Sequence, residues 1–173
     1  MIELLDKNVE KLLNEQVNKE FYSAYLYLDM ANYYADKSLD GFANWFRIQA
    51  QEERDHAMLF ITYMQNNGGA VTLDAIAAPD KVFSEIIQPL EAALEHEQFI
   101  TASINEIYHA ASEIKDYRSL QFLDWFIKEQ GEEEKNSEDL VKRFGLFGND
   151  AKGLYMLDSE MAARVYAAPS LVL

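Results

Sequence analysis

Residues that interrupt helices are scarce in this sequence, and this scarcity constrains the fold more than any other feature. The 173 residues include seven glycines and three prolines, and neither type occurs before Gly41. Long stretches are dominated by alanine, leucine, glutamate, glutamine and lysine, which favour helices, while a chain with few turn residues is difficult to fold into many short strands. The sequence therefore predicts an all-α fold, organised as one domain over residues 1–173.

Apolar residues recur at helical spacing in segments that are separated by short turn sequences. Ser38 or Asp40 can cap the second segment, and Pro89 favours a start near residue 88 for the third, although Ser84 could also cap it. The predicted helices cover about 2–36, 41–67, 84–115, 117–144 and 151–166, followed by a tail at 167–173. The longest connection, residues 68–83, links the second and third helices. This pattern is typical of a four-helix bundle (about 2–144) with one long crossover and a short additional helix.

Charge and composition exclude several classes of function. The formal net charge is −15, which opposes binding to nucleic acids and to anionic lipid surfaces and favours cations as partners. The absence of cysteine excludes disulfides and thiolate metal sites, so a metal would be bound by Glu, Asp, His, Tyr or Gln. No apolar run has membrane-spanning length, and we expect a cytoplasmic protein.

Each of the four long helices is predicted to place one glutamate within its apolar stripe, because residues three, four or seven positions apart share a helix face. On the second helix this glutamate has a histidine one turn away, with an aromatic residue above and below. That stripe consists of Phe46, Gln49, Glu53, His56 and Phe60. The inward glutamates of the first, third and fourth helices are Glu20, Glu97 and Glu133.

Four buried carboxylates cannot all remain charged without a counterion. Two like charges about 4 Å apart repel by roughly 4 kcal/mol at an effective dielectric constant near 20, and each also loses its hydration. The group must either take up protons or bind cations. His56 favours the second solution, because an imidazole one turn from carboxylates is typical of a carboxylate-rich iron or manganese pair.

Two further features have both a functional and a structural interpretation. Tyr27 shares the face of Glu20; a core tyrosine needs only a hydrogen-bond partner, but beside a redox metal its phenol can also give up an electron. Glu129, Glu132 and Glu133 are spaced so that they could converge with Glu52 on a neighbouring cation, whereas such a charged run is otherwise a solvated helix face. His96 and His109 lie away from the predicted cluster.

Nearly the whole chain resembles the non-haem ferritins of bacteria and archaea. The segments "LLNEQVNKEFYSAYLYL", "AQEERDHA", "EHEQFITASIN" and "FLDWFIKEQGEEE" resemble the family's four long helices, and "GLYMLDSEM" its short fifth helix. The resemblance implies a ferritin-like fold and a ferroxidase centre with two iron positions. The implied residues of the first position are Glu20, Glu53 and His56. Glu53 would bridge to the second, held by Glu97 and Glu133, with Gln130 nearby.

The same resemblance implies a third iron position and a redox-active tyrosine. The residues that match the third position are Glu52, Glu129, Glu132 and the shared Glu133, and Tyr27 matches the tyrosine beside the centre. Haem-containing relatives carry a second Glu-x-x-His on the fourth helix and a methionine after the second-helix glutamate. This chain has Gln130 with Glu133 and Arg54 at these places, so we expect no haem.

The expected activity is oxidation of Fe(II) by dioxygen, and the resemblance implies storage of Fe(III) mineral in a homo-oligomeric shell of twenty-four subunits. Two alternatives stay open from the sequence. A metal-free helical scaffold would show no rise in melting temperature with anaerobic Fe(II), because only a ligand of the folded state stabilises it. A soluble di-iron carboxylate oxidase acting on an organic substrate would form a small oligomer rather than a shell.

Overall fold

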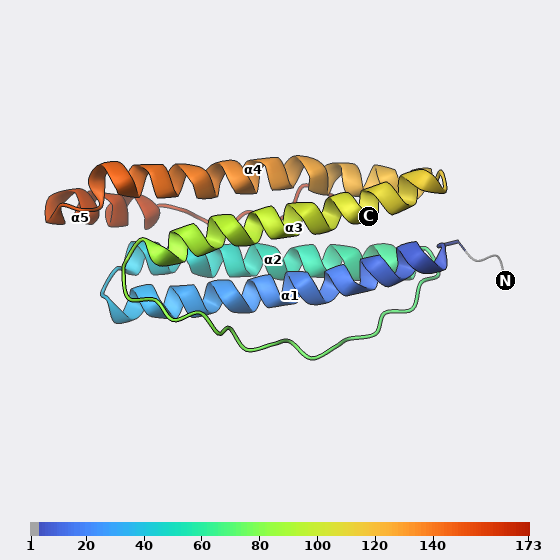
Figure 1. Ribbon diagram of the computed structural model, residues 1–173, viewed down its shortest axis with the longest axis horizontal. Coiled ribbons are helices and arrows are strands. Elements are labelled where there is room, and N and C mark those ends of the chain that lie inside the picture. Colours follow the sequence, from blue (N-terminus) through green and yellow to red (C-terminus); the bar gives the residue numbers. More distant parts are fainter. Residues whose placement is uncertain (1–3) are drawn as a thin grey trace.

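The computed structural model describes residues 4–173 as helices that are joined by turns and one long connection and followed by a tail (Figure 1). No strand occurs within these residues. The all-α prediction is therefore confirmed. The helices are α1 (Lys7–Asp36), α2 (Asp40–Asn66), α3 (Gln88–Glu113), α4 (Tyr117–Phe147) and α5 (Ala151–Met161).

The four long helices form a bundle of two antiparallel pairs, in which α1 lies against α2 and α3 lies against α4 (Figure 1). Residues 67–87 travel along the outside of the bundle, so α2 and α3 run in the same direction. The predicted bundle with one long crossover is confirmed, and α5 packs at one end against α2 and α4. Within residues 4–173, no helix combines the length and the apolar character needed to cross a bilayer.

Several helix boundaries differ from the sequence prediction. Ile2, the predicted start of the first helix, lies outside the described residues; α1 begins at Lys7, where the side chain of Asp6 accepts hydrogen bonds from the first turn. Helix α3 begins at Gln88 rather than at Ser84, with proline in its first turn, where no backbone donor is needed. Helix α4 continues to Phe147. Helix α5 ends at Met161, five residues earlier than predicted, so the tail is longer.

The start of α2 is capped from another helix, and the predicted caps Ser38 and Asp40 are wrong. The residue before the helix, Leu39, makes no side-chain cap. Instead the carboxylate of Asp158 on α5 accepts a hydrogen bond from the backbone N–H of Phe42 at 3.0 Å. Gly41 allows this close approach, since a Cβ there would lie 1.7 Å from the carbonyl oxygen of Asp158. A tertiary contact therefore replaces the local cap.

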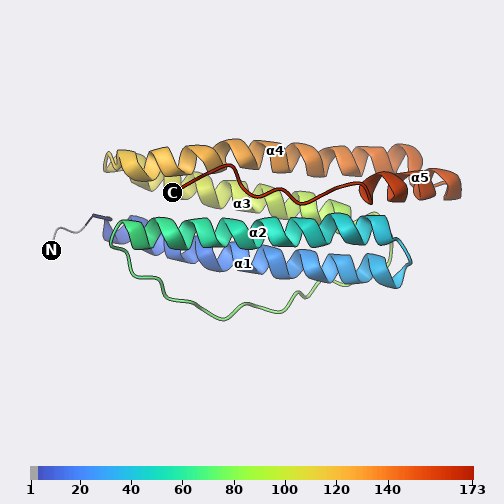
Figure 2. The ribbon, with the colours of Figure 1, turned by 180° about the vertical axis from the view of Figure 1, so that it is seen from behind.

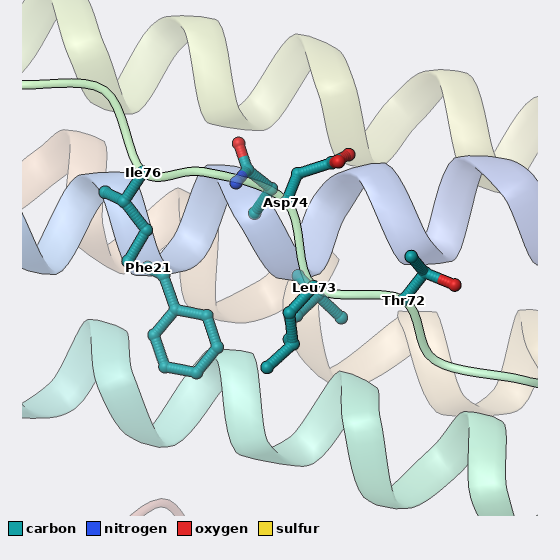
Figure 3. Close-up of a pocket in the computed structure, with 7 residues that line it drawn as sticks. Phe21, Thr72, Leu73, Asp74 and Ile76 are labelled. Carbon is teal, nitrogen blue, oxygen red and sulfur yellow. The ribbon is translucent and has the colours of Figure 1, made fainter.

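The crossover is bound to the surface of α1 by paired amide hydrogen bonds. Asn14 donates to the carbonyl of Thr72 at 3.0 Å and accepts from its N–H at 2.8 Å. Figure 3 shows this segment passing over α1, with Phe21 and Leu73 lining a shallow apolar hollow beside Ile76. None of the inward glutamates lines this hollow, so the hollow is separate from the predicted metal cluster.

The buried apolar side chains form two clusters, one toward each end of the bundle. The cluster near α5 includes Tyr27 and Phe46, and the cluster at the opposite end includes Phe60 and Phe126. Between Phe46 and Phe60, the inward face of α2 carries polar residues instead. The core therefore contains a polar layer at the level where the four inward glutamates were predicted.

Candidate metal centre

Four glutamates and one histidine, contributed by all four long helices, meet in this polar layer. The exposed fraction is 1% for Glu20, Glu53 and Glu97, 2% for His56 and 5% for Glu133. Each side chain faces inward because it lies on the apolar stripe of its helix, so packing of the stripe buries the polar group as well. The structure therefore brings together all five residues that the helical spacing had placed on the inward faces.

The five residues form two groups whose potential ligand atoms lie within 4.8 Å of one another. The first group is Glu20, Glu53 and His56, and the second is Glu53, Glu97 and Glu133. Glu53 belongs to both groups. A carboxylate has two oxygens, so one side chain can bind a cation in each group. This arrangement suits two adjacent metal ions that share one bridging carboxylate.

The donor atoms fit oxygen-preferring transition metals. Carboxylate oxygens with a single imidazole nitrogen suit iron or manganese better than soft, thiolate-bound metals. Glu20 Oε2 also has no hydrogen-bond partner although it is fully buried. A buried polar atom without a partner costs free energy, and a bound cation would supply that partner.

Glu20 and Glu97 hold protons when no cation is bound. Burial, with the charge of nearby Glu53, raises the pKa of Glu20 to about 8 and that of Glu97 to about 8. Burial and the charge of Glu53 also raise the pKa of Glu133 well above its ordinary value. Glu20 and Glu97 therefore stay neutral near pH 7, which is one of the two solutions expected for crowded carboxylates.

Glu53 and His56 form the charged pair of the cluster. Burial by itself lowers the pKa of His56, but Glu53, Glu20 and Glu133 outweigh burial and raise it to about 10. Burial likewise acts to raise the pKa of Glu53, but the charge of His56 and several hydrogen bonds lower it overall. His56 Nδ1 lies 3.2 Å from Glu53 Oε2. The imidazolium thus pairs with a carboxylate oxygen that a metal ion would use. Metal binding therefore requires His56 to lose a proton.

Two buried glutamines orient the carboxylates, and the sequence interpretation gave neither of them a role. Gln16 donates to Glu20 Oε1 at 2.7 Å, and Gln49 donates to Glu53 Oε1 at 2.8 Å. In both cases the glutamine lies one turn before the glutamate on the same helix. The repeated Gln-x-x-x-Glu spacing on the first two helices was a visible signal. The amide of Gln49 also reaches α4, where it donates to Glu133 Oε2 at 2.9 Å.

Gln130 and Tyr27 both act as hydrogen-bond donors to Glu97. The amide nitrogen of Gln130 lies 3.0 Å from Glu97 Oε2. The phenol of Tyr27 donates to Glu97 Oε1, and its ring contacts Phe46. Tyr27 is 1% exposed, and burial together with the charge of Glu97 raises its pKa well above the ordinary value. The structure thus places both residues directly at the second ligand group.

The predicted accessory residues are near the centre but are not assembled into a third group. Among residues 4–173, no group of closely spaced ligand atoms combines Glu52, Glu129 and Glu132. Glu129 is half-buried and Glu132 is exposed. Glu52 is paired instead with Arg164, whose Nη2 lies 2.5 Å from Glu52 Oε2. The guanidinium of Arg164 is therefore paired with Glu52, the predicted accessory residue that directly precedes Glu53 in the sequence.

His96 is half-buried beside Ser23 and Tyr27. Its Nε2 lies 2.7 Å from Ser23 Oγ, and its ring meets Tyr27 edge-on at a centroid distance of 5.9 Å. Burial lowers its pKa, so the ring is neutral near pH 7. His96 is in neither ligand group, as expected from its direction on the helix.

Comparison with known proteins agrees with this geometry. A family model described as a ferritin-like domain matches residues 10–147, a span that contains both ligand groups. The chain belongs to the ferritin family. The family resemblance inferred from the sequence is therefore confirmed, and the described helices have the ferritin bundle topology.

Individual ferritins resemble the chain over almost its whole length. A bacterial non-heme ferritin of Campylobacter jejuni is 41% identical over 155 residues, covering 90% of this chain and 93% of that protein. A probable bacterial non-heme ferritin-like protein of Haemophilus influenzae is 37% identical over 158 residues, covering 91% and 96%. An engineered closed form of the Archaeoglobus fulgidus ferritin superposes with a TM-score of 0.92 at 39% identity, covering 94% of this chain and 99% of that one.

Proposed function

We propose that this ferritin is a ferroxidase and iron-storage protein. It binds two Fe(II) ions at the two ligand groups, oxidises them with dioxygen and stores the Fe(III) product as a mineral. One observation carries the proposal: two groups of potential ligand atoms inside one bundle share Glu53. Two ions held side by side can deliver electrons to the same dioxygen molecule, which separate sites could not do.

In this proposal each side chain has a defined part in handling Fe(II). Glu20 and His56 hold the first ion, Glu97 and Glu133 hold the second, and Glu53 bridges the two. Each Fe(II) supplies one electron, so two ions together with two protons reduce one dioxygen molecule to hydrogen peroxide. Hard, anionic oxygen donors bind Fe(III) more strongly than Fe(II), which gives the oxidation its direction. The ligand set contains only one imidazole, so it stays dominated by oxygen.

The remaining predicted residues have supporting roles in the proposal. Gln130 orients Glu97. Tyr27 gives a further electron to dioxygen, and Glu97 accepts the phenol proton, since the phenol already donates to Glu97. Glu52, Glu129 and Glu132, with the shared Glu133, form a third and weaker iron position, and no haem takes part. A cation bound there must displace Arg164 from Glu52.

The proposed assembly is a hollow cytoplasmic shell of twenty-four copies. Support comes from the likeness to solved ferritins, including a ferritin of Archaeoglobus fulgidus described as having an open pore, with a TM-score of 0.91 and 38% identity. The formal charge of −15 attracts Fe(II) to such a shell. Family membership disfavours both the metal-free scaffold and the small di-iron oxidase.

Aerobic oxidation of Fe(II), followed optically, tests the proposal. The substitution Glu53→Ala removes a ligand from both groups, so we expect the initial rate to fall by more than about 100-fold, beyond the usual effect of losing an outer partner. Glu106→Gln on the exposed face of α3 is the matched control and keeps the wild-type rate. Equal rates for wild type and Glu53→Ala would contradict the assignment of Glu53 as a shared metal ligand. A native mass far below that of twenty-four 19.9 kDa chains would contradict the proposed shell.

A further inference from the structure

The side chain of Gln49 connects the two halves of the metal centre. Its amide nitrogen donates to Glu53 Oε1 at 2.8 Å and to Glu133 Oε2 at 2.9 Å, and the side chain is 2% exposed. Glu53 lies on α2 and Glu133 on α4. One NH₂ group therefore sets the separation of two carboxylates on different helices. Both carboxylates belong to the second ligand group, whereas only Glu53 belongs to the first.

The oxygen of the same amide is held by Arg164, which lies beyond α5. Arg164 Nη1 donates to Gln49 Oε1 at 2.9 Å and to the carbonyl of Trp45 at 3.3 Å. Its Nη2 donates to Glu52 Oε2 at 2.5 Å, and the guanidinium carbon lies 4.2 Å from the centroid of the Trp45 ring. The guanidinium is thus fixed by an amide, a carbonyl, a carboxylate and an aromatic face, and only 22% of the side chain is exposed.

The chain beyond α5 has a defined path that delivers Arg164 to this place. Figure 2 shows these residues returning along the bundle between α2 and α4. Asn44 donates to the carbonyl of Arg164 at 3.1 Å, Tyr166 donates to Asp55, and Trp125 donates to the hydroxyl of Ser170 at 2.9 Å. The tail is therefore attached to both helices that carry Glu53 and Glu133.

We propose that Arg164 is a positioning residue for the second metal ion, acting through the amide of Gln49. An amide in the opposite orientation would turn its oxygen toward two carboxylates and its NH₂ group toward a guanidinium, which is unfavourable at both ends. A cation at the amide oxygen also polarises the amide and strengthens the hydrogen bonds that its N–H groups donate. Arg164 thereby keeps Glu53 and Glu133 at the spacing that the second ion needs.

This inference rests on the proposed metal centre, and it predicts a larger effect on the affinity for the second ion than on the affinity for the first. Glu133 belongs only to the second group, and Glu20 is oriented separately by Gln16. Loss of Arg164 should therefore weaken binding of the second ion more than binding of the first. A purely structural contribution to folding would instead lower the stability of the metal-free protein and affect both ions alike.

Anaerobic titration with Co(II), monitored by its visible absorption, measures the two affinities without turnover. In Arg164→Met the affinity for the second ion should fall about tenfold, the low end of the range for losing a direct partner of a metal ligand, because Arg164 acts through Gln49. The affinity for the first ion should stay within about twofold. Arg164→Lys keeps the charge but not the planar fork, so it should recover part of the loss, and it serves as the second variant if Arg164→Met folds poorly. Val165→Ala changes an exposed side chain next to Arg164 in the same tail, so it is the matched control and should keep both affinities.

A double-mutant cycle with Gln49→Met decides whether the effect passes through the amide. If it does, Arg164→Met has little further effect in the Gln49→Met background; additive losses overturn the inference. An unchanged second affinity in Arg164→Met, or an equal loss at both ions, also overturns it. Failure of the wild type to bind two Co(II) ions per chain overturns the proposed centre itself, so the two failures are distinguishable.

Discussion

Glu53 and His56, one turn apart on α2, form a buried ion pair, with His56 Nδ1 3.2 Å from Glu53 Oε2. Each is a potential ligand of the first metal ion. In the metal-free protein the positive charge beside Glu53 is the protonated His56. In the metal-bound protein it would be the metal ion. Protons and metal ions therefore compete for one set of side chains, which determines how the protein responds to pH.

Metal binding should release protons. Near pH 7, His56, Glu20 and Glu97 are protonated in the metal-free protein, since the pKa of each is raised to about 8 or higher. Adding Zn(II) anaerobically to weakly buffered protein should acidify the solution, and the apparent affinity should rise with pH through about 8, where Glu20 and Glu97 lose their protons. Glu20→Gln, which has no carboxyl proton to lose, should release fewer protons. Absence of any pH change beyond the dilution control would contradict the protonation pattern.

The metal-free protein should lose stability as pH rises. The pKa of Glu20 is raised from 4.5 to about 8, so the folded state keeps a proton that the unfolded state releases. The resulting stabilisation is fully present below 4.5 and is lost as pH rises through 8. For His56, raised from 6.5 to about 10, it is present below 6.5 and lost as pH rises through 10.

Thermal unfolding of chelator-treated protein between about pH 6 and 9 tests whether stability falls as pH rises. Such a fall is expected wherever the folded state binds more protons than the unfolded state. The melting temperature should decrease across this range, and Glu20→Gln should flatten the decrease. A melting temperature that rises with pH in the absence of metal would show that the cluster is ionised rather than protonated.

Tyr27→Phe should have both a structural and a redox effect. The phenol donates to Glu97, so its loss leaves a buried carboxyl oxygen with one partner fewer and should lower the free energy of unfolding by about 1–3 kcal/mol. A tyrosyl radical signal in samples frozen soon after aerobic Fe(II) addition should also disappear. Tyr34→Phe is the matched control, because that buried phenol donates to the carbonyl of Ile86, outside the cluster. A radical that persists in Tyr27→Phe would exclude Tyr27 as its source.

Two relays of hydrogen bonds reach the metal centre: one runs from Arg164 through Gln49, and the other runs from Lys19 to Glu20. Binding of the first ion should depend on the relay from Lys19. Lys19 donates to Ser103 at 2.6 Å, Ser103 donates to Gln16 at 2.6 Å, and Gln16 donates to Glu20 at 2.7 Å. Ser103→Ala removes the partner of the Gln16 amide oxygen. We expect the first Co(II) affinity to fall about tenfold with the second nearly unchanged, the reverse of Arg164→Met. Equal losses at both ions would show that the two relays do not act separately.

Metal binding at the proposed third position should respond to loss of Arg164 in the opposite direction. Arg164→Met releases Glu52 from its ion pair, so a third Co(II) equivalent should bind more tightly near Glu52 and Glu129 even though the second binds more weakly. A general loosening of the protein could not strengthen one site while weakening another. Isothermal titration at high Co(II) concentration measures this step. A weaker third equivalent in the variant would contradict the competition between Arg164 and a cation for Glu52.

Local rules are sufficient to place Glu20, Glu53, His56, Glu97 and Glu133 on the inward faces of their helices. Helical periodicity alone fixes the face on which a side chain lies, and a carboxylate on an apolar stripe is buried when that stripe packs. The scarcity of glycine and proline determines the helical class in the same way. These properties depend only on residues within a few positions along the chain.

Only the tertiary structure decided what surrounds those side chains. Asp158 caps α2 from another helix, Arg164 reaches Gln49 because α5 ends at Met161, and Glu52 therefore carries a side-chain partner in place of an open coordination site. These contacts join residues more than 100 positions apart. No local periodicity encodes them, because they depend on how whole helices pack and on where the tail turns back along the bundle.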